Sequence, residues 1–301
     1  MRKLIFILCF THSALLLFSG NVKIKDIKDT NENAGAGDIR YKSESRNITI
    51  MNAGPVKYHF RYNYIDDPNY LKINPEAALP RIGDTTASNT GIGLTPAWYE
   101  NGFIGISVNG SNVFGEVAKI DISDNSQGRV EFTWNMPDGV VKAIFIMPEN
   151  GDRIFCRVDA GEVKNLKSLN LTFLALPGHR GMQKMLDRWC STSEHNWQYL
   201  SDGAKAKDLD MKSENWILFY DSQDNPLGSA GILFDTEKLQ DVQCMPGSMI
   251  IKIKISARPE CHKVDFVIWG FPDNYKNPET AYDYLNENSG KILKELRNFK
   301  F

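Results

Sequence analysis

The chain has 301 residues, of which 42% are hydrophobic, and a formal net charge of −2. This hydrophobic content is typical of a folded protein and argues against intrinsic disorder. The slightly negative charge argues against a nucleic-acid-binding surface. The length is sufficient for one large β domain or for two ordinary domains.

The chain begins with MRKLIFILCFTHSALLLFSG, in which Arg2 and Lys3 precede an apolar run interrupted at residues 11–13. A run this short does not span a bilayer stably, so residues 1–20 are predicted to be a secretory signal peptide. We therefore expect a secreted or periplasmic protein. No later stretch reaches the ~18 apolar residues of a spanning helix, so no membrane span is expected.

The segment after the signal, residues 21–40, is polar, charged and interrupted by glycine and alanine. We interpret it as a flexible leader, with a marginal first strand as the alternative. The folded part then covers residues 41–301.

Alternation of apolar and polar residues dominates this part. In RVEFTWNM (129–136), every second side chain is apolar, as in a strand with one buried face. Pro137-Asp138-Gly139 supplies a turn, and VVKAIFIM (140–147) returns as the next strand. Similar runs are predicted as strands at 47–52, 56–64, 103–108, 113–122, 153–158, 168–176, 216–220, 229–235, 249–256 and 264–271. Turn signals about every ten residues favour an all-β sandwich or large barrel over a βαβ arrangement. The number of strands suits a single large antiparallel β-sandwich, with two smaller sandwiches as the alternative.

Two segments have a helical pattern. MQKMLDRW (182–189) could form two turns. Over 278–298 the pattern is stronger, because Asn277 suits the N-cap and Pro278 the first helical position. The apolar face of this C-terminal α-helix contains Ala281, Leu285, Ile292 and Leu296, and Gly290 weakens its middle. We expect the helix to cover an edge or a face of a sheet.

Four cysteines follow the signal: Cys156, Cys190, Cys244 and Cys261. In an oxidising compartment they could form one or two disulfides, with three possible complete pairings. Cys244 and Cys261 flank a strand about 25 Å long at ~3.3 Å per residue, so they meet only if their loops fold back. Cys156 could equally be a buried free thiol. A zinc site from Cys190, His195, Cys261 and His262 lacks the usual close spacing, so we predict no metal and no cofactor.

Functional residue types are concentrated at 176–203, where the strand alternation is lost. The candidate catalytic residues are His179, His195 and Glu194, since imidazole and carboxylate groups act as general acids and bases. The candidate ligand-binding residues here are Arg180, Trp189 and Trp197. Aromatic rings stack on sugar faces, and arginine pairs with acidic groups. The alternative is that both tryptophans are core anchors and the histidines are solvated.

A second long connection, residues 79–102, contributes Trp98 and Tyr99 as further ligand-binding candidates, beside Glu100. If both connections lay at one end of the sandwich, they could form a groove. The sequence does not show whether they are close.

A long chain of antiparallel strands with loops bearing His, Arg, Trp and Glu resembles the galactose mutarotase-like β-supersandwich over residues 45–272. This architecture occurs in carbohydrate epimerases and in domains of polysaccharide lyases and glycosidases. The resemblance implies a histidine and a glutamate acting as acid and base. In this sequence they would be His179 or His195 with Glu100 or Glu194.

Three functional hypotheses follow. The first is a secreted carbohydrate-binding β-sandwich protein of unknown ligand, with a carbohydrate or polysaccharide as partner. The second is a carbohydrate epimerase or a polysaccharide lyase-like enzyme that uses a His/Glu acid–base pair. The third is a structural or interaction module of the cell envelope, which predicts an exposed apolar patch or an open sheet edge instead of a pocket. The sequence leaves the oligomeric state open.

Overall fold

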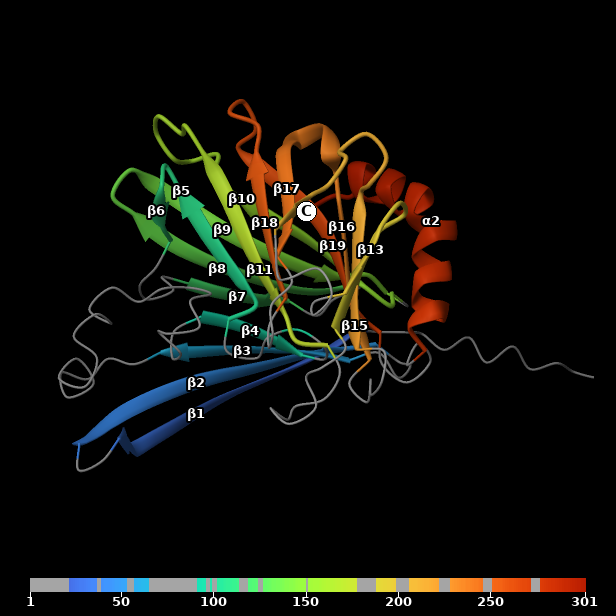
Figure 1. The fold of residues 1–301 in the computed structure, drawn as a ribbon. Coiled ribbons are helices and arrows are strands. Elements are labelled where there is room, and N and C mark those ends of the chain that lie inside the picture. The colour runs from blue at the N-terminus through green and yellow to red at the C-terminus, as the bar shows by residue number, and fades with distance from the viewer. Residues whose placement is uncertain are drawn as a thin grey trace, which may run out of the picture.

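The computed structural model describes residues 22–36, 39–52, 57–64, 91–95, 98, 102–113, 119–123, 127–149, 151–177, 188–198, 206–221, 228–245, 251–271 and 277–301. Across these ranges the chain forms three antiparallel sheets and a C-terminal helix (Figure 1). The predicted all-β sandwich with a C-terminal helix is therefore confirmed.

The largest sheet has nine strands, in the order β13 (Asn196–Gln198), β12 (Arg188–Ser191), β15 (Trp216–Asp221), β16 (Ser229–Phe234), β19 (Lys263–Phe271), β10 (Ile154–Asp159), β9 (Gly139–Met147), β8 (Gly128–Met136) and β7 (Lys119–Ser123). Its central strands are buried on both faces. In β19, Phe266 and Ile268 enter the main core, whereas Val267 and Trp269 face the helix. This double burial explains why these strands are continuously apolar.

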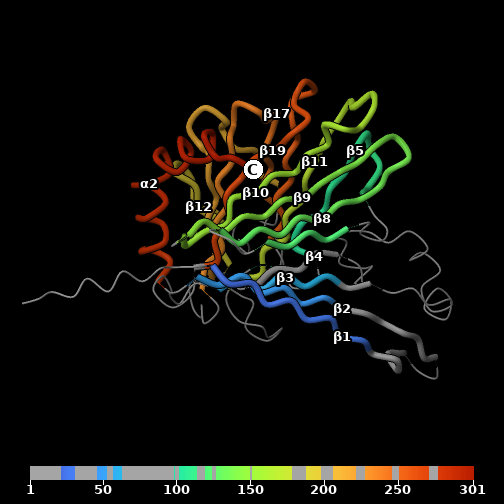
Figure 2. Tube along the Cα trace, turned by 180° about the vertical axis from the view of Figure 1, so that it is seen from behind, coloured from blue at the N-terminus to red at the C-terminus, as the bar shows by residue number. Residues whose placement is uncertain are grey.

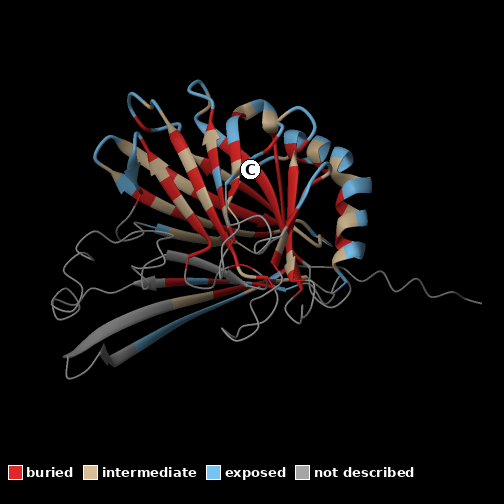
Figure 3. Ribbon diagram, in the orientation of Figure 1, coloured by how far each residue is buried: buried red, intermediate tan, exposed pale blue. Residues whose placement is uncertain are grey.

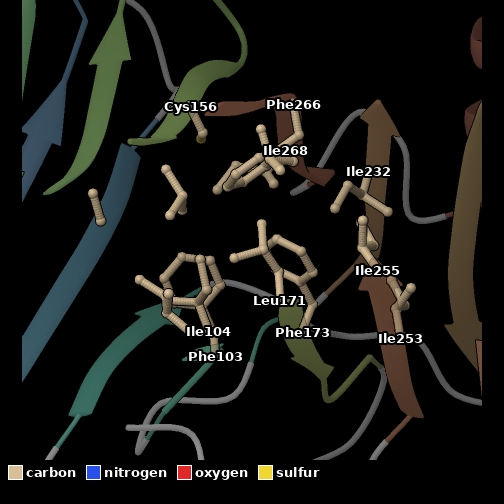
Figure 4. Packing of buried hydrophobic residues seen from close by; sticks show 14 of the residues in the cluster. Phe103, Ile104, Cys156, Leu171, Phe173, Ile232, Ile253, Ile255, Phe266 and Ile268 are labelled. Carbon is tan, nitrogen blue, oxygen red and sulfur yellow. The ribbon is translucent and has the colours of Figure 1, made fainter. Parts of the chain in front are cut away.

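A six-stranded sheet packs on the inner face of the first. Its order is β14 (Lys207–Asp208), β17 (Leu239–Met245), β18 (Ile251–Ala257), β11 (Leu169–Ala175), β5 (Ile104–Val108) and β6 (Ser111–Asn112). Figure 4 shows side chains of β11 and β18 pointing toward those of β10, β16 and β19. Phe173 and Phe266 meet edge to face across this gap, with ring centroids 4.8 Å apart. The two sheets thus form a sandwich.

The third sheet has four strands, in the order β1 (Lys23–Ala36), β2 (Ile39–Met51), β3 (Lys57–Tyr64) and β4 (Gly91–Thr95). It lies below β8 and β9 (Figure 2). Phe60 of β3 packs against Phe145 of β9, with ring centroids 4.9 Å apart. The same hydrophobic cluster therefore continues from the sandwich into this sheet.

Of the two interpretations of residues 21–40, the structure has the strand: β1 occupies most of this segment and pairs with β2 along their length. Val22 is buried, and Gly128 lies so close that a Cβ there would be 2.6 Å from Val22 Cγ1. Arg46 of β2 forms an ion pair with Asp26 of β1 at 2.6 Å. The polar composition of this segment is that of an edge strand with an exposed face.

Helix α2 (Pro278–Asn298) packs on the outer face of the nine-stranded sheet (Figures 1 and 3). Asn277 Oδ1 accepts a hydrogen bond from Glu279 N at 3.0 Å, which confirms the predicted cap. The four predicted apolar residues are all buried, against Trp216, Leu218 and other side chains of the sheet. Arg297 near the end of α2 pairs with Asp235, which caps the short 3₁₀ helix η3 (Thr236–Lys238).

The helix predicted over 182–189 is wrong at its end, because Arg188 and Trp189 belong to strand β12. Residues 182–187 lie outside the described residues. Within the described part of the chain, no helix combines the length and the apolar character needed to cross a bilayer.

Candidate functional site

The hairpin formed by β12 and β13 lies at one edge of the nine-stranded sheet, beside α2 (Figure 2). Its register pairs Cys190 with Trp197 and Ser191 with Asn196. Because successive side chains of a strand alternate between faces, Cys190 and Trp197 point into the core, and Ser191 and Asn196 point outward. Trp189 also faces outward, on the side that α2 covers.

A cavity of about 770 Å³ lies between this hairpin and the first turns of α2. Its volume is within the ~300–1,000 Å³ typical of small-molecule sites. Its walls come from the hairpin, β15 and α2: Trp189, Ser191, Ser193, Glu194, His195, Asn196, Tyr220, Asn277, Pro278, Glu279, Tyr282 and Asp283.

Aromatic side chains form two of these walls. Trp189 of β12 and Tyr220 of β15 are cross-strand neighbours, with ring centroids 6.4 Å apart and planes within 3° of parallel. Tyr282 lies on α2 and is held edge-on by Trp216, at 5.5 Å between centroids. The cavity therefore offers flat apolar surfaces held in place by packing.

A small hydrogen-bond network orients Asn196. Its Oδ1 accepts hydrogen bonds from Ser191 Oγ at 2.6 Å and from Tyr220 OH at 3.3 Å. Because both hydroxyl groups donate to the carbonyl oxygen, the Nδ2 amide is the group that Asn196 offers to a ligand as a hydrogen-bond donor.

His195 and Glu214 form the second polar element. His195 Nδ1 lies 2.8 Å from Glu214 Oε1. The Glu214 side chain has no exposed surface, whereas that of His195 is 53% exposed. Since a carboxylate accepts a hydrogen bond, it selects the tautomer protonated at Nδ1. Nε2, with its lone pair, is then the atom that can act on a ligand.

The hairpin turn fixes the position of this pair. Thr192 Oγ1 donates to Glu214 Oε1 and accepts hydrogen bonds from the backbone N–H groups of Glu194 and His195. The backbone N–H of Asp210 donates to Glu214 Oε2 at 2.7 Å. Three donors thus satisfy the buried carboxylate, which would otherwise be costly to bury.

Three of the described residues that line the cavity are acidic. Glu194 lies on the hairpin, and Glu279 and Asp283 face it from successive turns of α2. Among the described lining residues none is lysine or arginine.

The structure brings three of the predicted site residues together, since Trp189, Glu194 and His195 all line the cavity. Trp197 lies behind it, 7% exposed and stacked on His195 with ring centroids 5.4 Å apart. It therefore supports the imidazole and is not itself a wall. His179, Arg180 and Tyr99 lie outside the described residues, as does Glu100.

The prediction that Trp98 binds a ligand does not agree with its position, because Trp98 lies in the hydrophobic core. It is 2% exposed, and its Nε1 donates to the carbonyl oxygen of Trp269 at 2.8 Å. Its ring packs edge-on against Phe103 and Phe219. A side chain enclosed in this way does not stack on a ligand.

The sequence did not single out Glu214, Tyr220 or Tyr282. Tyr220 and Tyr282 lie within a predicted strand and the predicted helix, where an outward-facing tyrosine has no distinguishing signal. In the described ranges no three His, Cys, Asp or Glu side chains form a possible metal site.

No family model matches the chain, and no curated protein matches it in sequence. A solved structure that matches is the α-N-acetylgalactosaminidase NagBb from Bifidobacterium bifidum in complex with GalNAc. The TM-score is 0.43 with 9% identity, and the match covers 82% of this chain but 38% of that chain. A similarity this low carries no argument about function, and it does not confirm the mutarotase-like resemblance.

Proposed function

We propose that this protein binds a neutral carbohydrate in the cavity between the β12–β13 hairpin and α2. The observation that carries the proposal is the combination, in one cavity, of the Trp189–Tyr220 pair with the Asn196 amide and the His195 imidazole. A sugar ring has an apolar face and a rim of hydroxyl groups. The aromatic pair suits the face, and the amide and imidazole suit the rim.

The charge of the cavity supports a neutral ligand over an acidic one. A uronate would bring its carboxylate toward Glu194, Glu279 and Asp283, and the described walls offer no lysine or arginine to pair with it. Like charges at close range disfavour such a complex. A polysaccharide lyase acting on uronates is for the same reason the less favoured form of the enzyme hypothesis.

Binding is tested by affinity electrophoresis and titration calorimetry with a panel of neutral and uronate-containing polysaccharides. We expect binding to a neutral member and no binding to the uronates. Trp189→Ala should weaken binding at least tenfold, and Trp189→Phe should retain part of the affinity, since it keeps a flat ring.

His262→Ala serves as a control, because His262 is exposed and does not line the cavity. It should bind like the wild type. Absence of binding to every polysaccharide, or a Trp189→Ala variant with undiminished affinity, would contradict the proposal.

The His195–Glu214 pair favours a second candidate, a carbohydrate epimerase. A histidine held by a buried carboxylate is a common arrangement for a general base, and Nε2 of His195 is the atom that would accept the proton. Glu194, Glu279 or Asp283 would supply the carboxylate partner of this acid–base pair across the cavity.

This candidate is tested by following the anomeric or epimeric composition of neutral sugars over time. If the wild-type protein speeds the interconversion of the anomers or epimers, His195→Gln should abolish this effect and His262→Ala should not. Equal interconversion rates with and without the wild-type protein would contradict the epimerase candidate.

The envelope-module hypothesis has less support. Ile27, at 39% exposure, is the one large hydrophobic residue that is exposed within the described residues. The described residues therefore form no large exposed apolar patch. The open sheet edge that the hypothesis also predicts has a candidate in β1, the edge strand of the four-stranded sheet.

A further inference from the structure

Two cysteines meet in the core directly behind the cavity. The Sγ atoms of Cys190 and Cys244 are 3.1 Å apart, and neither residue has exposed surface. Cys190 lies on β12 of the nine-stranded sheet and Cys244 on β17 of the six-stranded sheet. The contact therefore joins the two layers of the sandwich.

The strand register holds both sulfur atoms in this position. Cys190 is paired with Phe219 on one side and Trp197 on the other. Cys244 is paired with Ile253 and Lys207. The sulfur atoms are thus fixed by strand pairing, and their separation exceeds the ~2.05 Å of a disulfide by only about 1 Å.

The other two cysteines have different surroundings. Cys156 is buried on β10, with its thiol donating to the carbonyl oxygen of Ile154 at 3.5 Å. Cys261 is partly exposed in the connection before β19. Neither contacts another cysteine in the part of the chain that the structure describes, so the geometry selects one of the possible pairings.

We propose that Cys190 and Cys244 form an inter-sheet disulfide that anchors the β12–β13 hairpin to the opposite sheet. A thiolate of one cysteine attacks the disulfide of oxidised glutathione or of a thiol–disulfide oxidoreductase and forms a mixed disulfide. The second thiolate then displaces the bound sulfur. Two protein thiols lose two protons and two electrons, and the attacked disulfide is reduced to two thiols.

The bond forms while the chain is folding. Burial raises the pKa of the Cys190 thiol in the folded protein, and the neighbouring Cys244 adds to this shift. The thiolate needed for attack is therefore disfavoured once the sandwich has closed. Exchange must occur before the two sheets enclose the sulfur atoms.

The bond would stabilise the site as well as the fold. Cys190 lies between Trp189 and Ser191, which face the cavity, so a bond at Cys190 restrains both neighbours. It would close a loop between residues 54 positions apart, and longer loops give larger stabilisation.

The test starts from the full chain, reduced and unfolded, which is then refolded in a mixture of oxidised and reduced glutathione. The product is denatured with an alkylating agent, without reductant, and digested for mass spectrometry. We expect a linked peptide pair containing Cys190 and Cys244, two hydrogens lighter than the free peptides. Cys156 and Cys261 should be alkylated, as should Cys9 where residues 1–20 are retained. Alkylation at both Cys190 and Cys244, or a link between another pair, would overturn the proposal.

A thermal measurement gives an independent result. Reductant should lower the Tm of the refolded wild type by roughly 5–10 °C. It should lower that of Cys156→Ala equally and leave a Cys190→Ala/Cys244→Ala variant unchanged. A wild-type Tm that does not respond to reductant would count against the bond, and if the double variant does not fold, the peptide map alone decides.

Discussion

Nδ1 of His195 lies 2.8 Å from Oε1 of Glu214, a carboxylate with no exposed surface. Glu214 precedes β15, whereas His195 is in the turn of the β12–β13 hairpin. The pair therefore links two segments that pack at one edge of the sheet. Because the carboxylate also accepts hydrogen bonds from Thr192 and from the backbone of Asp210, one buried charge organises the turn, the imidazole and the start of β15.

The first prediction concerns the tautomer of His195. In the wild type at pH 8, ¹⁵N NMR should show the proton on Nδ1, since Glu214 accepts a hydrogen bond from it. In Glu214→Ala this preference should be lost, and the free energy of unfolding should fall by about 3 kcal/mol because three donors lose their partner. Glu260→Ala, at an exposed position, should change neither quantity.

A wild-type spectrum with the proton on Nε2 would contradict this assignment. It would mean that Nδ1 accepts a hydrogen bond, and that Glu214 does not orient the ring.

The main strands were predictable because burial imposes a period of two. In β8, Val130, Phe132 and Trp134 are all buried and alternate with partly exposed residues, as the sequence pattern indicated. The helix was predictable for a similar reason. Its cap at Asn277 and its apolar face are local features that need no knowledge of distant residues.

The site itself was only partly predictable. The strands β12 and β13 have four and three residues, too few for a periodic signal. Arg188 is buried opposite Asp221, a pairing that only the strand register creates. Glu214 is buried because donors from two other segments converge on it, and nothing in its own neighbourhood indicates this.

The second prediction concerns acid stability. Burial raises the pKa of the Asp265 carboxyl, but hydrogen bonds from Arg157 and Lys238, at 2.6 and 2.7 Å, outweigh burial and lower the pKa overall. A lowered folded-state pKa stabilises the protein above the unfolded value of about 3.9, and this contribution is lost as pH falls through the folded value.

Asp265→Asn should therefore be less stable than the wild type by about 3 kcal/mol at pH 7, since two cations lose their counter-charge. Urea unfolding should show this difference shrinking below pH 4. Asp138→Asn, at an exposed turn, should follow the wild-type curve. A difference that is constant from pH 7 to pH 2 would show that the carboxylate charge is not the cause.

The third prediction concerns thiol accessibility. Of the four cysteines that follow residue 20, Cys261 should be the first to react with iodoacetamide in the native protein, because Cys156, Cys190 and Cys244 have no exposed surface. Partial burial, with the nearby Glu260, raises the pKa of the Cys261 thiol. Labelling should therefore still accelerate above pH ~8.5, the ordinary thiol value. Cys261→Ser should remove the native labelling at these four positions, and rapid modification of Cys156 would contradict the packing of β10.

The last prediction compares two glycines with opposite requirements. Gly290 lies in α2, and a Cβ added there would meet no atom within 4 Å. Gly290→Ala should stabilise the protein by about 0.5–1 kcal/mol, because alanine loses less backbone entropy in a helix.

Gly139 has φ +150°, and a Cβ there would lie 2.2 Å from the carbonyl oxygen of Glu162. Gly139→Ala should therefore destabilise the β8–β9 turn. Thermal unfolding of both variants checks this, and a rise in Tm for Gly139→Ala would mean that the turn does not have the backbone conformation described.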